Sequence, residues 1–312
     1  MFLVCGEALF DFFLEAEEGP GSARYAARAG GSPFNVAIGL ARLGRASGLL
    51  TGVSRDLLGQ RLRRVLEDEG VATGHLIATD RPTTISLVGL DTAGVPAYQF
   101  YDAGSADTGV TVADLPAIGP EVEGLHFGSY SIAAEPVADA LLALASAERG
   151  RFISLDPNIR PTVEPDMEVW RRRVDGLLPF VDLVKISTED LALLRPGTSP
   201  AAFAAELTGR GVALVAVTDG GEAAQAWTAT GVHAEATPPV VTVVDTVGAG
   251  DTFQAALLAR LLRASAGPKA ALAALDAAGL TALIDYAARA AAITCTRRGA
   301  DLPRAADLAD RG

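Results

Sequence analysis

Short apolar runs alternate with helix-like stretches along most of this sequence. The runs that read as buried strands lie at residues 2–5, 49–53, 124–127, 152–155, 183–186 and 214–217. Helical patterns lie between and after them, at residues 35–43, 57–69, 135–147, 252–262 and 282–293. This succession predicts an α/β fold, in which helices cover both faces of a mostly parallel central sheet.

Two stretches depart from the alternation. Residues Phe10 to Leu14 and Thr83 to Tyr101 have β-strand character, but no helical pattern follows them. They predict a small accessory sheet, separate from the main one. Because the sequence has no internal repeat and no linker rich in Pro and Ser, we expect residues 1–312 to form a single domain.

Composition and charge exclude several classes of protein. Hydrophobic residues make up 49% of the 312 residues and charged residues 21%, so the chain can build a large core. The formal net charge is −12 and no long run of Lys or Arg occurs, which argues against a protein that coats nucleic acid or an anionic membrane. A phosphate ligand remains compatible with this charge, because backbone N–H groups can bind phosphate.

The two cysteines are too few for a disulfide framework or a structural zinc site. The N-terminal residues include no basic region typical of a signal peptide, and no uncharged apolar run reaches the ~18 residues of a membrane span. We therefore expect a cytoplasmic protein. The basic run from Trp170 to Arg173 is expected on a solvated helix face.

The segment from Asp245 to Phe253 carries the clearest chemical signal. Gly248 and Gly250 stand directly before a long helical pattern, and glycine can adopt backbone angles that let consecutive N–H groups converge. At a helix N-terminus, such a nest of N–H groups suits the anionic transition state of phosphoryl transfer. The alternative is that Asp251 merely caps the helix. The paired glycines and the second carboxylate, Asp245, favour the chemical interpretation.

This segment resembles the C-terminal signature of the PfkB-type carbohydrate kinases, which belong to the ribokinase-like superfamily. The residues from Gly30 to Ala37, followed by Leu43 and Gly44, resemble the other signature of that family. The resemblance covers essentially the whole chain. It implies a ribokinase-like α/β fold with a small β-sheet lid, formed here by residues of about 10–30 and 83–107. It also implies transfer of the γ-phosphoryl group of ATP to a sugar hydroxyl.

The resemblance assigns residues to each part of the site. For catalysis it implies Asp251 as the general base and an anion nest formed by Gly248, Ala249 and Gly250. The residues that it implies for the sugar are Asp11, Gly30, Gly31, Asn35, Asn158 and Arg160. The residues that it implies for ATP are Lys185, Ser187, Thr218, Gly220 and Gly250. The plainer alternatives are a solvated Asp11 on the lid and a simple turn at Asn158 and Arg160.

Two cation sites also follow from the resemblance. Mg²⁺ would be held through water by a carboxylate of the segment after the strand at 183–186, and both Glu189 and Asp190 remain candidates. A monovalent cation such as K⁺ would be held by Asp245, the carbonyl group of Val247 and the loop at Gly299.

The motif from Gly6 to Asp11 and the segment from Asp156 to Pro161 look most like the fructokinase branch of the family. Kinases of 2-keto-3-deoxygluconate often carry Arg after an aromatic pair, whereas Asp102 follows Tyr101 here. We therefore expect a neutral ketose, D-fructose, as the sugar. A 2-keto-3-deoxygluconate kinase, another PfkB-type sugar or nucleoside kinase, and an inactive regulatory protein remain the alternatives.

The expected partners are small molecules, the sugar and ATP, and neither nucleic acid nor a membrane. An exposed face of the accessory sheet would also allow two copies of the chain to pair through the lid.

Overall fold

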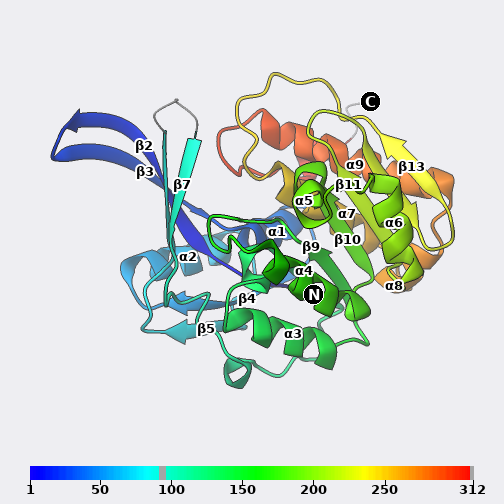
Figure 1. The fold of residues 1–312 in the computed structure, drawn as a ribbon, viewed down its shortest axis with the longest axis horizontal. Helices are drawn as coiled ribbons and strands as arrows, with labels where there is room; N and C mark the ends of the chain where they lie inside the picture. The colour runs from blue at the N-terminus through cyan, green and yellow to red at the C-terminus, as the bar shows by residue number, and fades with distance from the viewer. Residues whose placement is uncertain (91–95, 310–312) are drawn as a thin grey trace.

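The computed structural model describes residues 1–90 and 96–309, and a nine-stranded sheet runs through its larger part (Figure 1). The strand order is β13-β12-β11-β10-β9-β8-β1-β4-β5. The strands are β1 (Phe2–Cys5), β4 (Ser47–Ser54), β5 (Leu76–Thr79), β8 (Gly124–Gly128), β9 (Phe152–Asp156), β10 (Leu183–Ser187), β11 (Leu214–Thr218), β12 (Ala224–Thr228) and β13 (His233–Ala236). Pairing is parallel from β5 to β11 and antiparallel at the edge formed by β12 and β13.

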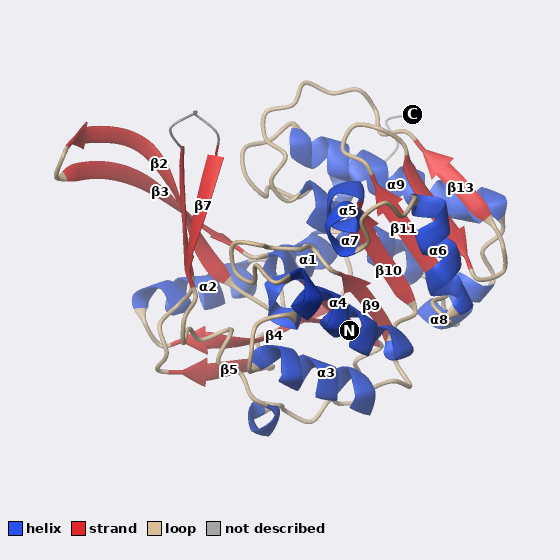
Figure 2. Ribbon diagram, in the orientation of Figure 1, coloured by secondary structure: helices blue, strands red, loops and turns tan. Residues whose placement is uncertain are grey.

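Helices cover both faces of this sheet (Figure 2). Those on one face are α1 (Ser32–Arg42), α2 (Leu57–Asp68), α7 (Ala249–Leu261), α8 (Pro268–Ala273) and α9 (Ala277–Cys295). Those on the other face are α3 (Val137–Ala147), α4 (Met167–Leu177), α5 (Thr188–Leu194) and α6 (Pro200–Gly209). Alternate residues of β1 enter different cores, Phe2 and Val4 on the first face and Leu3 and Cys5 on the second. The predicted α/β class and mostly parallel sheet are confirmed.

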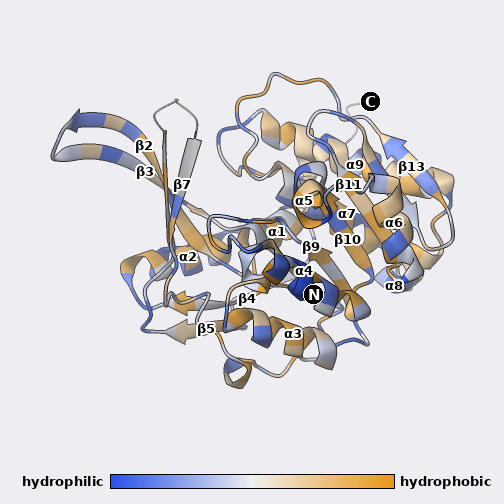
Figure 3. Cartoon of the chain, in the orientation of Figure 1, coloured by the Kyte–Doolittle hydropathy of each residue, from blue (hydrophilic) through white to orange (hydrophobic). Residues whose placement is uncertain are grey.

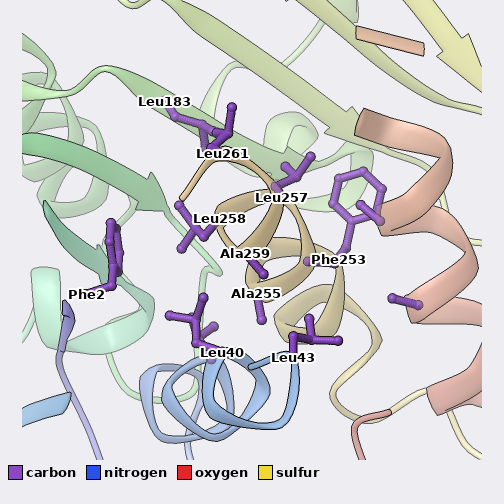
Figure 4. Packing of buried hydrophobic residues seen from close by; sticks show 14 of the residues in the cluster. Phe2, Leu40, Leu43, Leu183, Phe253, Ala255, Leu257, Leu258, Ala259 and Leu261 are labelled. Atoms are coloured by element: carbon purple, nitrogen blue, oxygen red, sulfur yellow. The ribbon is translucent and has the colours of Figure 1, made fainter. Parts of the chain in front are cut away.

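Helix α7 lies at the centre of the first core (Figure 4). Leu40 of α1 and Leu43, which caps the end of α1, pack near Ala255 and Ala259 of α7. The helices approach closely because their contact residues are small: a Cβ atom on Gly39 would lie 2.7 Å from the Cβ of Ala255. This close contact fixes the first turn of α7 relative to the first turn of α1.

A second, four-stranded sheet stands beside the main body, in the order β3-β2-β6-β7. Its strands are β2 (Leu9–Gly19), β3 (Ser22–Gly30), β6 (Ile85–Leu90) and β7 (Pro96–Tyr101). The β2–β3 hairpin extends away from the rest of the molecule (Figure 1), and its outer half is largely hydrophilic (Figure 3). The predicted accessory sheet is confirmed. Residues 91–95 of the predicted lid segment 83–107 lie outside the described residues.

Several predicted boundaries were wrong. The strand expected at Phe10 to Leu14 continues to Gly19 and returns as β3, which the sequence did not reveal because the outer residues are charged and exposed. Helix α7 begins at Ala249, three residues before the expected start at Thr252. Trp170 is fully buried, and its Nε1 donates to the Glu164 carbonyl oxygen at 2.9 Å. The prediction that this residue lies on a solvated helix face was therefore wrong.

Across residues 1–90 and 96–309, none of the helices combines the length and the apolar character that crossing a bilayer requires.

Gly52 provides a test of how closely β4 packs against the segment after β7. A Cβ atom on Gly52 would lie 1.9 Å from the backbone oxygen of Ala106. We expect Gly52→Ala to lower the free energy of unfolding by about 3 kcal/mol or more, because a backbone atom must shift. Gly150→Ala is the control, since its Cβ would meet no atom within 4 Å, and we expect a change within about 0.5 kcal/mol. Equal urea midpoints for the two variants would contradict this packing.

Candidate active site

The candidate site lies where the carboxyl ends of β9, β10 and β11 meet the N-termini of α1 and α7. Ligands of open α/β sheets collect at this edge, because the loops there open away from the packed core. Asp156 ends β9, Ser187 ends β10 and Thr218 ends β11. The sheet therefore brings together segments that are far apart in the sequence.

The first turn of α7 has the conformation that an anion nest requires. Gly248 is the N-cap residue, with φ 81 and ψ 0 in the left-handed region. A Cβ atom there would lie 2.7 Å from the Cβ of Ala300, so both backbone angle and space favour glycine. Ala249 and Gly250 follow as the first helical residues. The Ala249 N–H donates to the Thr246 carbonyl oxygen at 3.2 Å, whereas the Gly250 N–H belongs to the turn that lacks intrahelical acceptors. The helix dipole makes this end positive.

Asp251 is the third residue of α7, and it does not cap the helix. Its side chain is 6% exposed and points to α1: Ser32 Oγ donates to Oδ1 at 2.6 Å, and Asn35 Nδ2 donates to Oδ2 at 2.8 Å. Burial raises the pKa of Asp251 above that of an ordinary aspartate, although the bonds from Ser32 and Asn35 oppose the rise. A buried carboxylate of raised pKa at an anion nest is suited to accept a proton.

Lys185 places a positive charge next to this turn. Its Nζ lies 2.9 Å from Asp156 Oδ2, and both side chains are buried. A Cβ atom on Gly250 would lie 3.0 Å from the same Nζ, so the missing side chain leaves space for the ammonium group. Burial lowers the pKa of Lys185, but the Asp156 carboxylate outweighs it, and the pKa stays above its ordinary value. The lysine is therefore charged at neutral pH.

Two buried acceptor atoms in the same region have no hydrogen-bond partner: Asp156 Oδ1 and Asn158 Oδ1. Asn158 has φ 41, and its Nδ2 donates to Ser32 Oγ at 3.3 Å. A non-glycine residue held at positive φ and buried acceptors without donors both cost free energy. Such features are typical of a site whose polar groups are completed by a ligand.

The residues expected at ATP and Mg²⁺ line the next part of the edge. Asp190 is largely buried, and its Oδ1 accepts from the Ile159 N–H at 3.1 Å. Burial raises its pKa, and Asp156 raises it further. Glu189 is exposed. The geometry therefore favours Asp190 over Glu189 as the carboxylate that faces the site.

The other nucleotide candidates have different surroundings. The Ser187 hydroxyl oxygen accepts from the Asp190 N–H at 3.0 Å and so caps α5. Its expected contact with ATP stays a prediction. Thr218 is half-buried at the end of β11, and Gly220 is exposed with φ 52. Both stand on the open edge of the sheet.

Asp11 and Arg160 are both expected at the sugar. Burial raises the pKa of Asp11 to about 6, against the neighbouring Ser86 hydroxyl and the charge of Arg160. Arg160 also lowers the pKa of Asp190, so its charge acts toward both the sugar side and the ATP side. A Cβ on Gly30 would lie 2.8 Å from Asp11 Oδ2, which places the carboxylate directly against the end of β3.

The three residues expected at a monovalent cation are brought together. Asp245 Oδ1 accepts from the Val247 N–H at 3.1 Å, and Oδ2 accepts from the Gly299 N–H at 2.8 Å. The carboxylate thus ties the segment before α7 to the loop after α9.

The sequence did not identify Ser32, Asp156 or Glu7 as site residues. Ser32 bridges Asn158 and Asp251, and Asp156 pairs with Lys185. A buried apolar strand that ends in Asp was a visible signal for Asp156. No comparable signal marks Ser32, since a serine at the start of a helix is an ordinary residue.

Comparison with known proteins agrees with this geometry. The family model described as pfkB family carbohydrate kinase matches residues 1–306. A fructokinase of Rhizobium leguminosarum bv. trifolii is 40% identical over 279 residues, which are 88% of this chain and 84% of that protein.

Solved structures show the same fold. The fructokinase of Xylella fastidiosa with bound ATP superposes with a TM-score of 0.89 at 26% identity, covering 98% of this chain and 96% of that one. The fructokinase of Vibrio cholerae O395 with fructose, ADP and calcium ion has a TM-score of 0.84 at 28% identity, covering 99% and 98%. The resemblance inferred from the two sequence signatures is confirmed: the chain belongs to the pfkB family of carbohydrate kinases.

Proposed function

We propose that this protein is an ATP-dependent fructokinase, which transfers the γ-phosphoryl group of ATP to a hydroxyl group of D-fructose. The observation that carries the proposal is the buried Asp251 carboxylate, held by Ser32 and Asn35 in the first turn of α7. The relative at 40% identity is a fructokinase. The two solved structures, one with ATP and one with fructose and ADP, are also fructokinases, which supports the choice of substrates.

The reaction assigns a task to each group. The attacking hydroxyl oxygen of fructose bonds to the γ-phosphorus as the bond to the bridging oxygen of ADP breaks, and the hydroxyl proton passes to Asp251. The first turn of α7, with the Gly250 N–H at its positive end, stabilises the charge on the transferred group, and the Lys185 ammonium lies against the same turn. The sugar is bound by Asp11, Asn158, Gly30, Gly31 and Asn35. The nucleotide is bound by Thr218 and Gly220.

The donor set fits a Mg²⁺ ion held mostly by water and phosphate. Within the described ranges, no group of three Asp, Glu, His or Cys side chains could hold a metal ion on its own. Asp190 and the unbonded Oδ1 of Asp156 offer carboxylate oxygens, and Mg²⁺ usually keeps several waters with one or two carboxylates. When bound, the ion would offset the charge of the ATP phosphates. We propose that K⁺ is held by Asp245, the Val247 carbonyl and the Gly299 loop.

We further propose that the four-stranded sheet is a lid within one kinase domain of residues 1–312. Closing over the sugar would exclude water, which competes for the phosphoryl group. Both β3 and β7 are edge strands in the described sheet, and Tyr25 and Tyr101 are exposed on it. This supports pairing of two copies of the chain through the lid.

Because ATP is the proposed co-substrate, we propose the cytoplasm as the compartment of this protein.

The main alternative within the family is a kinase of 2-keto-3-deoxygluconate, whose carboxylate would need a cation when buried. Arg160 is a cation whose charge acts on Asp11, and its charge is opposed there by Asp11 and Asp190. A catalytically inactive regulatory protein would not require Asp251, the nest and Lys185 in one place. Both alternatives are therefore less consistent with the site.

The choice of sugar is tested by competition. We expect wild-type enzyme with ATP and Mg²⁺ to phosphorylate D-fructose faster than 2-keto-3-deoxygluconate when both are present at equal concentration. Mass spectrometry separates the two products. If the sugar acid is consumed first, the fructokinase assignment is wrong, and Arg160 or another cation must bind the carboxylate. A panel that adds ribose and adenosine distinguishes the other family alternatives.

The role of Asp251 is tested by replacing it with its uncharged analogue. We expect Asp251→Asn to lower kcat by at least about 10²-fold, because the proton acceptor is lost while the side-chain volume stays the same. Asp276→Asn is the matched control: Asp276 caps α9, and Asn is an equally good N-cap. A thermal melt confirms that both variants fold. Near-normal turnover by Asp251→Asn would remove it as the base.

The raised pKa of Asp11 predicts pH-dependent sugar binding. Above its pKa of about 6 the carboxylate is ionised and accepts charge-assisted hydrogen bonds, whereas below about 6 it is protonated and binds more weakly. We expect the dissociation constant for fructose, measured by calorimetry without ATP, to rise about fivefold between pH 7.5 and pH 5. In Asp11→Asn the dissociation constant should be nearly independent of pH. The same pH dependence in both proteins would assign the titration to another group.

A further inference from the structure

Glu7 is a buried carboxylate that the proposed chemistry does not use. It lies in the link between β1 of the main sheet and β2 of the small sheet, and it is 1% exposed. Both of its oxygens accept hydrogen bonds: Oε1 from the Ser32 N–H at 3.2 Å and Oε2 from Ser131 Oγ at 2.5 Å. Glu7 therefore connects two parts of the main body at the point where the small sheet begins.

The contact with Ser32 leads directly to the proposed base. Ser32 is the first residue of α1, where the helix dipole favours a negative charge. A Cβ on the preceding Gly31, which has φ 108, would lie 2.9 Å from the Glu7 carbonyl oxygen, so glycine lets the two segments meet. While its N–H binds Glu7, the Ser32 hydroxyl donates to Asp251 at 2.6 Å. One residue thus joins Glu7 to Asp251.

The contact with Ser131 leads to a second connection of the small sheet. Ser131 belongs to a 3₁₀ turn, Ser129–Ile132, that follows β8. The adjacent Tyr130 donates to Asp107 at 2.6 Å, and Asp107 also accepts from Thr84 at 2.5 Å and Ser105 at 2.8 Å. Thr84 immediately precedes β6, and Ser105 follows β7. The turn therefore contacts two connections of the small sheet. It binds Glu7, which precedes β2, and Asp107, which holds the start of β6 and the segment after β7.

We propose that Glu7 is a positioning residue for phosphoryl transfer, which fixes Ser32, and through it Asp251, relative to the connections of the small sheet. This inference rests on the proposed role of Asp251 as the base. It does not depend on which sugar is the substrate.

The charge of Glu7 is not what positioning requires. Burial raises its pKa to about 7, against hydrogen bonds from Ser131 and Ser129, and the neighbouring Asp107 raises it further. The groups that face it are Asp107 and Tyr130, and burial also raises the pKa of each. Neutral Glu7 can still accept from Ser32 with one oxygen and donate to the Ser131 hydroxyl with the other. Glutamine offers the same acceptor and donor, so it should replace Glu7.

The test is a double-mutant cycle, assayed with whichever sugar the wild-type enzyme phosphorylates fastest. We expect Glu7→Ala to lower kcat about tenfold or more while KM for ATP stays within about twofold, because the base is misplaced but the nucleotide side is not. Glu7→Gln should stay within about threefold of wild type. In the Ser32→Ala background, Glu7→Ala should cause a smaller loss than in wild type, because the Ser32 hydroxyl bond to Asp251 is already gone and Asn35 alone connects α1 to Asp251.

Ser131→Ala is included because Glu7→Ala could fail to fold. It removes one anchor of Glu7 with a small change, and we expect a several-fold loss of kcat that is smaller in the Ser32→Ala background. Asp107→Asn is the matched control: this carboxylate binds the same turn but does not contact Ser32. Its effect on kcat should be the same with and without Ser32→Ala.

Two results would overturn the inference. The first is that Glu7→Ala or Ser131→Ala lowers kcat by the same factor in wild type and in the Ser32→Ala background. The second is that Glu7→Ala and Ser131→Ala both have the kcat of wild type. The proposed function fails separately, if Asp251→Asn keeps its turnover or if fructose is not the preferred sugar.

Discussion

The site depends on one contact, the pair of hydrogen bonds that α1 donates to Asp251. Ser32 and Asn35 lie one turn apart on α1, so both reach the same carboxylate in the first turn of α7. The contact is possible because the two helices pack closely at Gly39 and Ala255. The packing of these two helices in the apolar core therefore sets the position of the proposed base, because a shift of either helix would move Asp251 relative to its donors.

The electrostatics of the site follow from burial. Burial raises the pKa of Asp190 and of Asp251, and the Asp156 carboxylate raises both further. Lys185 opposes both shifts and is itself kept charged by Asp156. Buried ions that are paired in this way contribute little net stability. Their arrangement around the positive end of α7 is better explained by a phosphate group that passes between them.

Apolar and polar contacts together attach the small sheet: Phe10 of β2 is buried in the first core and Leu9 in the second. Glu7 and Asp107 lie in different connections, and both bind the turn Ser129–Ile132. Most of the outer hairpin is exposed. The inner part of the sheet is thus held by both cores, while its outer hairpin extends into solvent.

The sequence by itself determined the α/β class, the family and most residues of the nest, because apolar periodicity and the glycines before α7 are local signals. It did not reveal the β3 strand, since pairing holds that charged segment in place more than its own composition does. It also could not identify Ser32 or Glu7, or decide between Glu189 and Asp190. Those residues acquire their roles from partners that lie 25 or more residues away, such as Glu7 and Ser32 or Ser32 and Asp251. Only the tertiary structure brings them within hydrogen-bond distance, because close helix packing and the parallel sheet, not local preference, set their positions.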